Sequence, residues 1–101
     1  DAAFQEKVGH RLFSENQPDD ALMYYEIAMD LAPEDTDAYH NAACCYHMLG
    51  RNDEAQTTFL QGIALTPTAA IHIEYAHFLI KQAAYGEALA HIIASEAYEP
   101  S

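Results

Sequence analysis

The chain has 101 residues, of which half are hydrophobic, and its sixteen acidic and four basic residues give a formal net charge of −12. This composition supports one small folded domain and argues against a disordered chain. The scarcity of Lys and Arg argues against nucleic acid and anionic membrane surfaces as partners, because both are bound through dense positive charge. A basic or apolar protein partner is compatible with it.

Apolar residues recur at spacings of three and four along the whole chain. Ala21, Leu22, Tyr25 and Ala28 are one example, and this is the period of an amphipathic helix. No strand-like alternation persists. We therefore expect an all-α protein with helices over residues 3–16, 18–31, 36–49, 52–65, 69–82 and 86–98.

Proline, glycine and small polar residues mark the ends of these helices. Pro18 suits a first helical residue, because that position needs no N–H donor. Asp35 or Thr36 can cap the helix that starts there, and Asn52 can cap the next one. Gly50 can take the left-handed conformation that ends a helix. A proline also follows each second helix, at Pro33, Pro67 and Pro100.

The pattern repeats with a period of 33 to 34 residues. Ala21, Ala55 and Ala88 are equivalent, as are Gly9, Ala43 and Ala76 in the preceding helices. These small residues let paired helices approach closely, and larger side chains fill the space beside them, at Tyr25, Phe59 and Ile92. One helical hairpin cannot bury its apolar face alone, so three stacked hairpins share a core.

The run from Tyr39 to Pro67, with its small–aromatic–small–proline order, resembles the tetratricopeptide repeat (TPR). The resemblance implies a single domain over 1–101, with repeats 2–35, 36–68 and 69–101 forming a right-handed solenoid of helix-turn-helix hairpins. It also implies that the first helices line a concave groove. The expected function is a non-enzymatic protein–protein interaction module, an adaptor that binds a peptide or protein segment there.

Helical phase indicates which residues of the first helices face this groove. They mix apolar, polar and charged side chains, which suits an extended peptide or a partner helix. The alternative is an inner face covered only by solvent. The groove residues are expected to be Glu6, Lys7, His10, Phe13, Asp37, His40, Asn41, Cys44, His47, Met48, Ile73, Glu74, His77, Ile80 and Lys81.

Some TPR domains use a clamp of Lys, Asn and Arg side chains to hold the acidic C-terminal tails of heat-shock chaperones. Only Asn41 of this chain matches that pattern. Glu6 and Glu74 stand where cations are expected, and His10 replaces an asparagine. A carboxylate there would repel an acidic tail, so we reject this ligand.

His40, Cys44 and His47 lie at positions i, i+4 and i+7 of one helix and could bind zinc. No second cysteine pair supports this, so we expect no metal site and no cofactor. His10, Cys44 and His77 are equivalent in the three repeats, which predicts a row across the groove and leaves a pH-sensitive groove as an alternative.

No catalytic residue is expected, because no orienting group for a thiol nucleophile and no phosphate-binding loop can be placed. Cys44 and Cys45 point apart on a helix, and Cys45 is expected to face the paired helix as a core residue. Without a disulfide framework, a reducing compartment and therefore the cytoplasm is favoured. No stretch reaches 18 apolar residues, so no membrane span is expected.

Two other functions stay open. The acidic chain and the run "NAACCYHMLG" (41–50), with Gly62, resemble type III secretion chaperones of the translocator class, whose groove holds a translocator segment. The second open function is a structural or dimerisation module. The exposed side of the last helix is expected to carry Ala90, Ala94 and Ala97. We expect either a second copy of the chain or further sequence to cover this side, as a capping helix would.

Overall fold

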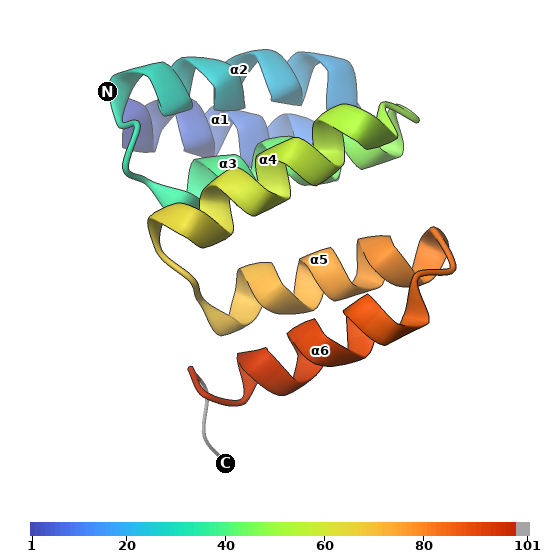
Figure 1. Ribbon diagram of the computed structural model, residues 1–101. Coiled ribbons are helices and arrows are strands. Elements are labelled where there is room, and N and C mark those ends of the chain that lie inside the picture. Colours follow the sequence, from blue (N-terminus) through green and yellow to red (C-terminus); the bar gives the residue numbers. More distant parts are fainter. Residues whose placement is uncertain (99–101) are drawn as a thin grey trace.

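The computed structural model describes residues 1–98, and its six helices form three helical hairpins (Figure 1). Within these residues there is no strand, so the all-α prediction is confirmed and every expected helix is present. The last helix ends at Ser95, before the predicted end at residue 98, and Pro100 lies outside the described residues. The helices are α1 Ala2–Ser14, α2 Pro18–Leu31, α3 Thr36–Met48, α4 Asn52–Leu65, α5 Ala69–Lys81 and α6 Tyr85–Ser95.

Each hairpin turn has the same backbone geometry. Asn16, Gly50 and Ala83 occupy equivalent places and all have positive φ, of 61°, 77° and 61°. The residue after each donates its N–H to a carbonyl five positions back, as in Arg51 N to Tyr46 O at 2.9 Å. This is the Schellman arrangement, in which a left-handed residue ends the helix. Gly50 therefore has the predicted role, although only the middle turn uses a glycine.

The helix starts agree only in part with the predicted caps. Pro18 is the first residue of α2, as predicted. Asp35 rather than Thr36 caps α3, because its carboxylate accepts a hydrogen bond from the Asp37 N–H at 3.0 Å. The prediction for Asn52 is wrong, since it is already the first residue of α4. The capping position belongs to Arg51, which makes no side-chain cap.

The first two hairpins pack through small residues and one tyrosine. A β-carbon at Gly9 of α1 would lie 2.7 Å from Tyr25 Cε1, so only glycine leaves room for this ring. Tyr25 is buried in a cluster with Ala21 and Leu22 of α2 and with Cys45 of α3. Cys45 is thus a core residue as expected, but its cluster joins it to the preceding hairpin and not to α4.

The third hairpin packs through aromatic rings. Phe59 of α4 lies 5.4 Å from Tyr75 and 5.7 Å from Phe78 of α5, measured between ring centroids. These rings fill the space between the hairpins, and α5 and α6 accordingly stand apart from the first four helices (Figure 1). The distance between the second and third hairpins decides which side chains of α3 and α5 contact each other.

On the outer face of α6 and just after its end, Ala90 and Ala97 are exposed as predicted, whereas Ala94 is half-buried. Leu89, Ile92 and Ile93 are 57%, 39% and 58% exposed, so the face is more apolar than an alanine surface. Ile92 does not fill the inter-helix space as Tyr25 and Phe59 do, because no further helix packs against it in the described chain. His91 of the same helix is half-buried and contacts His72.

Candidate functional site

A single pocket lies where the first helices of all three hairpins come together. Its volume is about 230 Å³. Six of its seven lining residues belong to the groove set predicted from helical phase, and the seventh is Tyr25 of α2. The predicted residues that line it are His10 and Phe13 of α1, His40, Asn41 and Cys44 of α3, and Glu74 of α5.

Two polar contacts connect different helices in this pocket. The Tyr25 hydroxyl and His10 Nδ1 share a hydrogen bond of 2.7 Å, which joins α2 to α1. The Cys44 thiol donates to Glu74 Oε2 at 3.8 Å, which joins α3 to α5. One imidazole nitrogen of His40, the sulfur of Cys44 and one carboxylate oxygen of Glu74 all lie within 4.8 Å of one another.

Burial alters the ionisation of this pocket. It raises the pKa of the Cys44 thiol to about 12, and the charge of Glu74 adds to the effect. Burial also lowers the pKa of His40, which the charges of Glu74 and Asp37 only partly oppose. At pH 7 the thiol is therefore protonated and the imidazole is neutral. A catalytic thiol needs the reverse shift, towards the thiolate.

A group of carboxylates joins α1 to the start of α3, with Glu6 one turn before His10 on α1 and Asp35 and Asp37 at the start of α3. The carboxylate oxygens of Glu6, Asp35 and Asp37 are within 4.8 Å of one another. Burial, followed by the neighbouring carboxylate of Asp35 and the charge of Asp37, raises the pKa of Glu6 to about 7. Like charges held this close disfavour the ionisation of all three carboxyl groups at once.

The remaining predicted groove residues do not line the pocket. His47 packs edge-on against Phe78, with ring centroids 5.0 Å apart, so it does not join His40 and Cys44. His77 is exposed and does not line the pocket with His10 and Cys44, and it is Glu74, one turn earlier on α5, that contacts Cys44. Ile73 is half-buried, and the others are exposed: Lys7, Met48, Ile80 and Lys81.

Sequence reasoning missed two residues of this region. Tyr25 was assigned to the core from its repeat position, and it is indeed buried, but its hydroxyl reaches the pocket. Asp35 was considered only as a helix cap, and no helical phase applies to a residue between helices. Its contact with Glu6 is made between two hairpins and has no local signal in the sequence.

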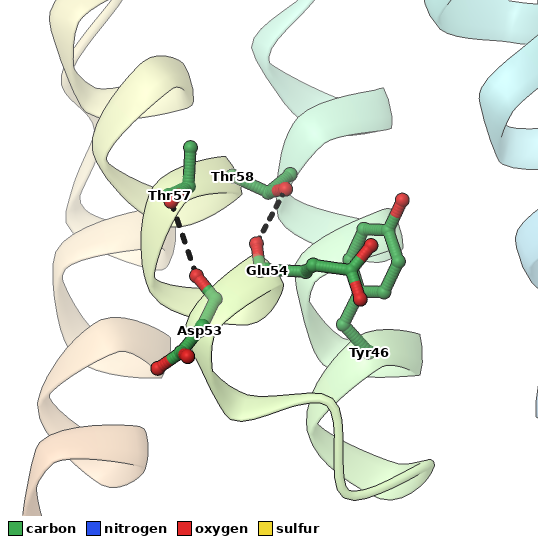
Figure 2. A pocket seen from close by; sticks show the side chains of 5 residues that line it. All are labelled: Tyr46, Asp53, Glu54, Thr57 and Thr58. Carbon is green, nitrogen blue, oxygen red and sulfur yellow. Dashed lines mark hydrogen bonds between the residues drawn. The ribbon is translucent and has the colours of Figure 1, made fainter.

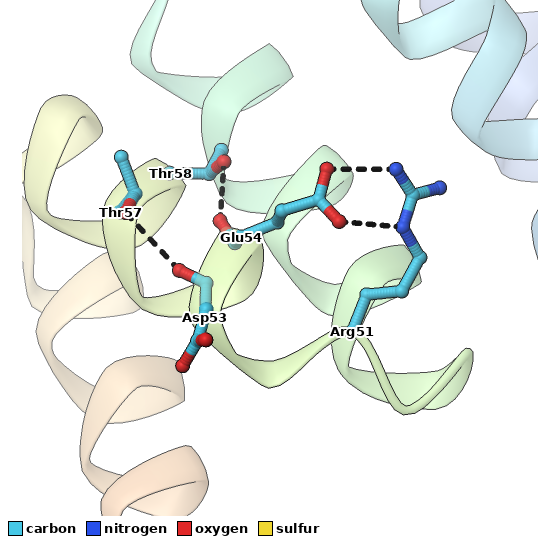
Figure 3. Close-up of polar contacts among 5 residues, drawn as sticks. All are labelled: Arg51, Asp53, Glu54, Thr57 and Thr58. Atoms are coloured by element: carbon cyan, nitrogen blue, oxygen red, sulfur yellow. Dashed lines mark hydrogen bonds and ion pairs between the residues drawn. The ribbon is translucent and has the colours of Figure 1, made fainter.

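A larger hollow, of about 310 Å³, lies beside α4 (Figure 2), lined by Tyr46, Asp53, Glu54, Thr57 and Thr58. Three of its five polar side chains, those of Glu54, Thr57 and Thr58, are already engaged (Figure 3). The Thr57 and Thr58 hydroxyls donate to the carbonyl oxygens of Asp53 and Glu54 on their own helix. The Glu54 carboxylate accepts two hydrogen bonds of 2.7 Å from Arg51. This hollow offers a ligand few free groups, so we place the candidate site in the smaller pocket.

Residues 12–72, more than half of the chain, match the sequence model of the tetratricopeptide repeat. The chain belongs to the tetratricopeptide repeat family. A curated relative, the protein O-mannosyl-transferase Tmtc3 of Drosophila melanogaster, is 31% identical over 74 residues, which are 73% of this chain but 8% of Tmtc3. This TPR chain therefore corresponds to a small part of that protein.

Solved TPR structures share the fold at low identity. The first TPR of Spaghetti (RPAP3), bound to the HSP90 peptide SRMEEVD, superposes with a TM-score of 0.89 at 20% identity, over 99% of this chain and 80% of that one. The translocator chaperone SycD of Yersinia enterocolitica gives a TM-score of 0.86 at 16% identity, over 98% of this chain and 78% of that one. None of the helices in residues 1–98 has the length and apolar character that a membrane span requires.

Proposed function

We propose that this TPR chain is a non-enzymatic interaction module that binds a segment of another protein across α1, α3 and α5. The observation that carries the proposal is the pocket itself, which draws side chains from the first helix of every hairpin. A ligand in such a pocket contacts all three repeats at once. The protonated Cys44 thiol supports a binding role over a catalytic one.

The charges of the groove favour a segment that carries Lys or Arg. Glu74 lines the pocket, and Glu6 of α1, one turn before His10, clusters with Asp35 and Asp37 at the start of α3. None of the seven lining residues, all within the described chain, is Lys or Arg. A cationic side chain can pair with these carboxylates, while Phe13 offers an apolar contact beside it. An acidic tail would meet repulsion at the same places.

The structural neighbours support a protein-interaction role without indicating a basic ligand. The RPAP3 domain is bound to an acidic HSP90 peptide, whereas SycD is a translocator chaperone. We propose that this chain is an adaptor whose ligand is a basic protein segment. A secretion chaperone is the second candidate function. The free cysteines suit a reducing compartment, so a cytoplasmic location is part of the proposal.

The test compares three fluorescent peptides of equal length that carry Lys, Glu or only neutral apolar side chains, with binding measured by fluorescence anisotropy. We expect the Lys peptide to bind most tightly and to weaken as salt is added. Glu74→Gln should weaken it by about tenfold or more, since a hydrogen bond between charged groups contributes roughly 1.5–3 kcal/mol. Glu26→Gln removes the same charge from an exposed site on α2 and serves as the matched control.

Tighter binding of the Glu peptide would contradict the proposed charge preference. Preference for the apolar peptide, unaffected by salt, would favour the secretion-chaperone function. Equal losses in Glu74→Gln and Glu26→Gln would show that the pocket is not the binding site.

A further inference from the structure

Three different metal-binding side chains meet in the pocket. His40 and Cys44 lie one turn apart on α3, and Glu74 reaches them from α5. The Cys44 Sγ to Glu74 Oε2 distance of 3.8 Å is close to the roughly 3.5 Å that separates two ligand atoms around tetrahedral zinc. All three side chains are half-buried, so they are shielded from bulk water without being closed off from it.

The contact between Cys44 and Glu74 already holds the ligands in place. The thiol donates a hydrogen bond to the carboxylate, and a bound cation would take the place of the thiol proton, which is released to solvent. A coordinating metal deprotonates a thiol outright, so the protonated thiol of the metal-free chain does not prevent binding. The net charge of −12 also attracts cations to the surface.

We propose that His40, Cys44 and Glu74 form a binding site for a zinc-class divalent transition-metal ion. The thiolate, the imidazole and the carboxylate supply three ligands, and the fourth position of a tetrahedron stays open towards the pocket. Sulfur and nitrogen donors select such an ion over Mg²⁺ or Ca²⁺, which prefer oxygen alone. The site goes beyond the proposed peptide binding and does not depend on it.

This site differs from the zinc alternative that the sequence raised. His47, the third residue of that pattern, packs on Phe78 and is replaced by Glu74, which lies 30 positions after Cys44. The ion would join α3 of the second repeat to α5 of the third. Because aromatic rings keep these two hairpins apart, we expect metal binding to stabilise their junction.

The first test uses Co²⁺ as a spectroscopic probe of the chelator-treated 101-residue chain. We expect thiolate-to-cobalt charge-transfer absorption and the intense visible bands of a four-coordinate ion, saturating at one equivalent and abolished by one equivalent of Zn²⁺. Cys44→Ser should remove the charge-transfer band, while Cys45→Ala, which alters the adjacent buried cysteine, should retain it. Absence of the band in the native chain, or its survival in Cys44→Ser, would overturn the site.

The second test measures thermal unfolding by circular dichroism with Zn²⁺ or Mg²⁺ and no peptide. We expect Zn²⁺ alone to raise the unfolding temperature. Glu74→Gln should weaken zinc affinity by at least about tenfold, the smallest loss found even for residues that only support a ligand. His77→Gln, an exposed histidine on the same helix, should bind zinc as the native chain does.

Equal shifts with Mg²⁺ and Zn²⁺ would mean that the acidic surface binds cations without selection, and would overturn the proposal. A loss in His77→Gln as large as that in Glu74→Gln would do the same. Unchanged helical signal in the unheated variants keeps these results independent of misfolding.

Discussion

The imidazole rings of His72 and His91 stack in the third hairpin, with centroids 5.1 Å apart and their Nδ1 atoms separated by 2.9 Å. Burial and the neighbouring charge of His91 lower the pKa of His72, and burial lowers that of His91 although Glu87 opposes it. Tyr75 and Tyr98 complete the aromatic surroundings. The pair is therefore stable when both rings are neutral.

We expect this hairpin to lose stability in mild acid. Below pH 6.5 the unfolded chain binds protons that the folded pair resists, so the unfolding free energy falls as the pH is lowered through the depressed pKa values. His91→Gln should flatten this dependence when urea unfolding is compared at pH 7.5 and 5.0. Other titrating groups are common to both chains and cancel in the difference, so an identical pH slope would contradict the prediction.

Gly9→Ala should destabilise the first hairpin. The added β-carbon would lie 2.7 Å from the Tyr25 ring, and overpacking of this kind typically costs about 1–3 kcal/mol. This exceeds the gain of at most about 1 kcal/mol from replacing a helical glycine. The control is Gly86→Ala in α6, where nothing lies within 4 Å and only the gain is expected. Urea unfolding that shows the same sign for both variants would refute the role of the close contact.

Ala83→Gly should stabilise the third hairpin. Ala83 has a φ of 61°, a left-handed conformation that costs an L-residue roughly 1–2 kcal/mol and costs glycine little. Part of that gain is lost to the greater freedom of glycine in the unfolded chain. Asn16→Gly, at the equivalent turn, should gain less because asparagine tolerates this conformation. Thermal unfolding of both variants should show a larger increase in the unfolding midpoint for Ala83→Gly than for Asn16→Gly. A midpoint of Ala83→Gly below that of the native chain would contradict the prediction.

Glu6→Gln should stabilise the chain at pH 8 and have little effect at pH 4. The pKa of Glu6 is raised to about 7, so the folded state binds its proton more tightly and loses this contribution as the pH rises from about 4.5 through 7. Solvent screening limits the gain to about 1 kcal/mol or less. Glu34→Gln, an exposed carboxyl in the adjoining loop, controls for the general loss of negative charge. A gain of equal size at both pH values would oppose the assignment.

We predict that the outer face of α6 mediates self-association. Leu89 and Ile93 lie one turn apart and are both more than half exposed, and contiguous apolar surface of this kind marks protein contacts. The mass from light scattering should rise with concentration in the native chain and stay monomeric in Ile93→Glu. Met23→Glu, at an exposed apolar residue of α2, should behave as the native chain does. A native monomer at every concentration would remove the prediction.

Most of the fold could be predicted because its signals are local. The helices follow from apolar spacing within each segment, and the hairpins follow from the recurrence of Ala21, Ala55 and Ala88, which are all buried as expected. The predictions that Asn52 caps α4 and that Ile92 fills the space between helices are wrong for different reasons. The first depends on one residue of register at a helix start, and the second depends on what covers α6.

The sequence by itself determined which side chains of a first helix share one helix face, because helical phase depends only on spacing along one helix. Only the tertiary structure decided which of them meet. Glu74 rather than His77 faces Cys44, and Glu6 meets Asp35, across gaps of about thirty residues in the chain. The contact between Cys44 and Glu74 depends on how far the aromatic rings of Phe59, Tyr75 and Phe78 hold the second and third hairpins apart, and no local sequence pattern indicates that distance.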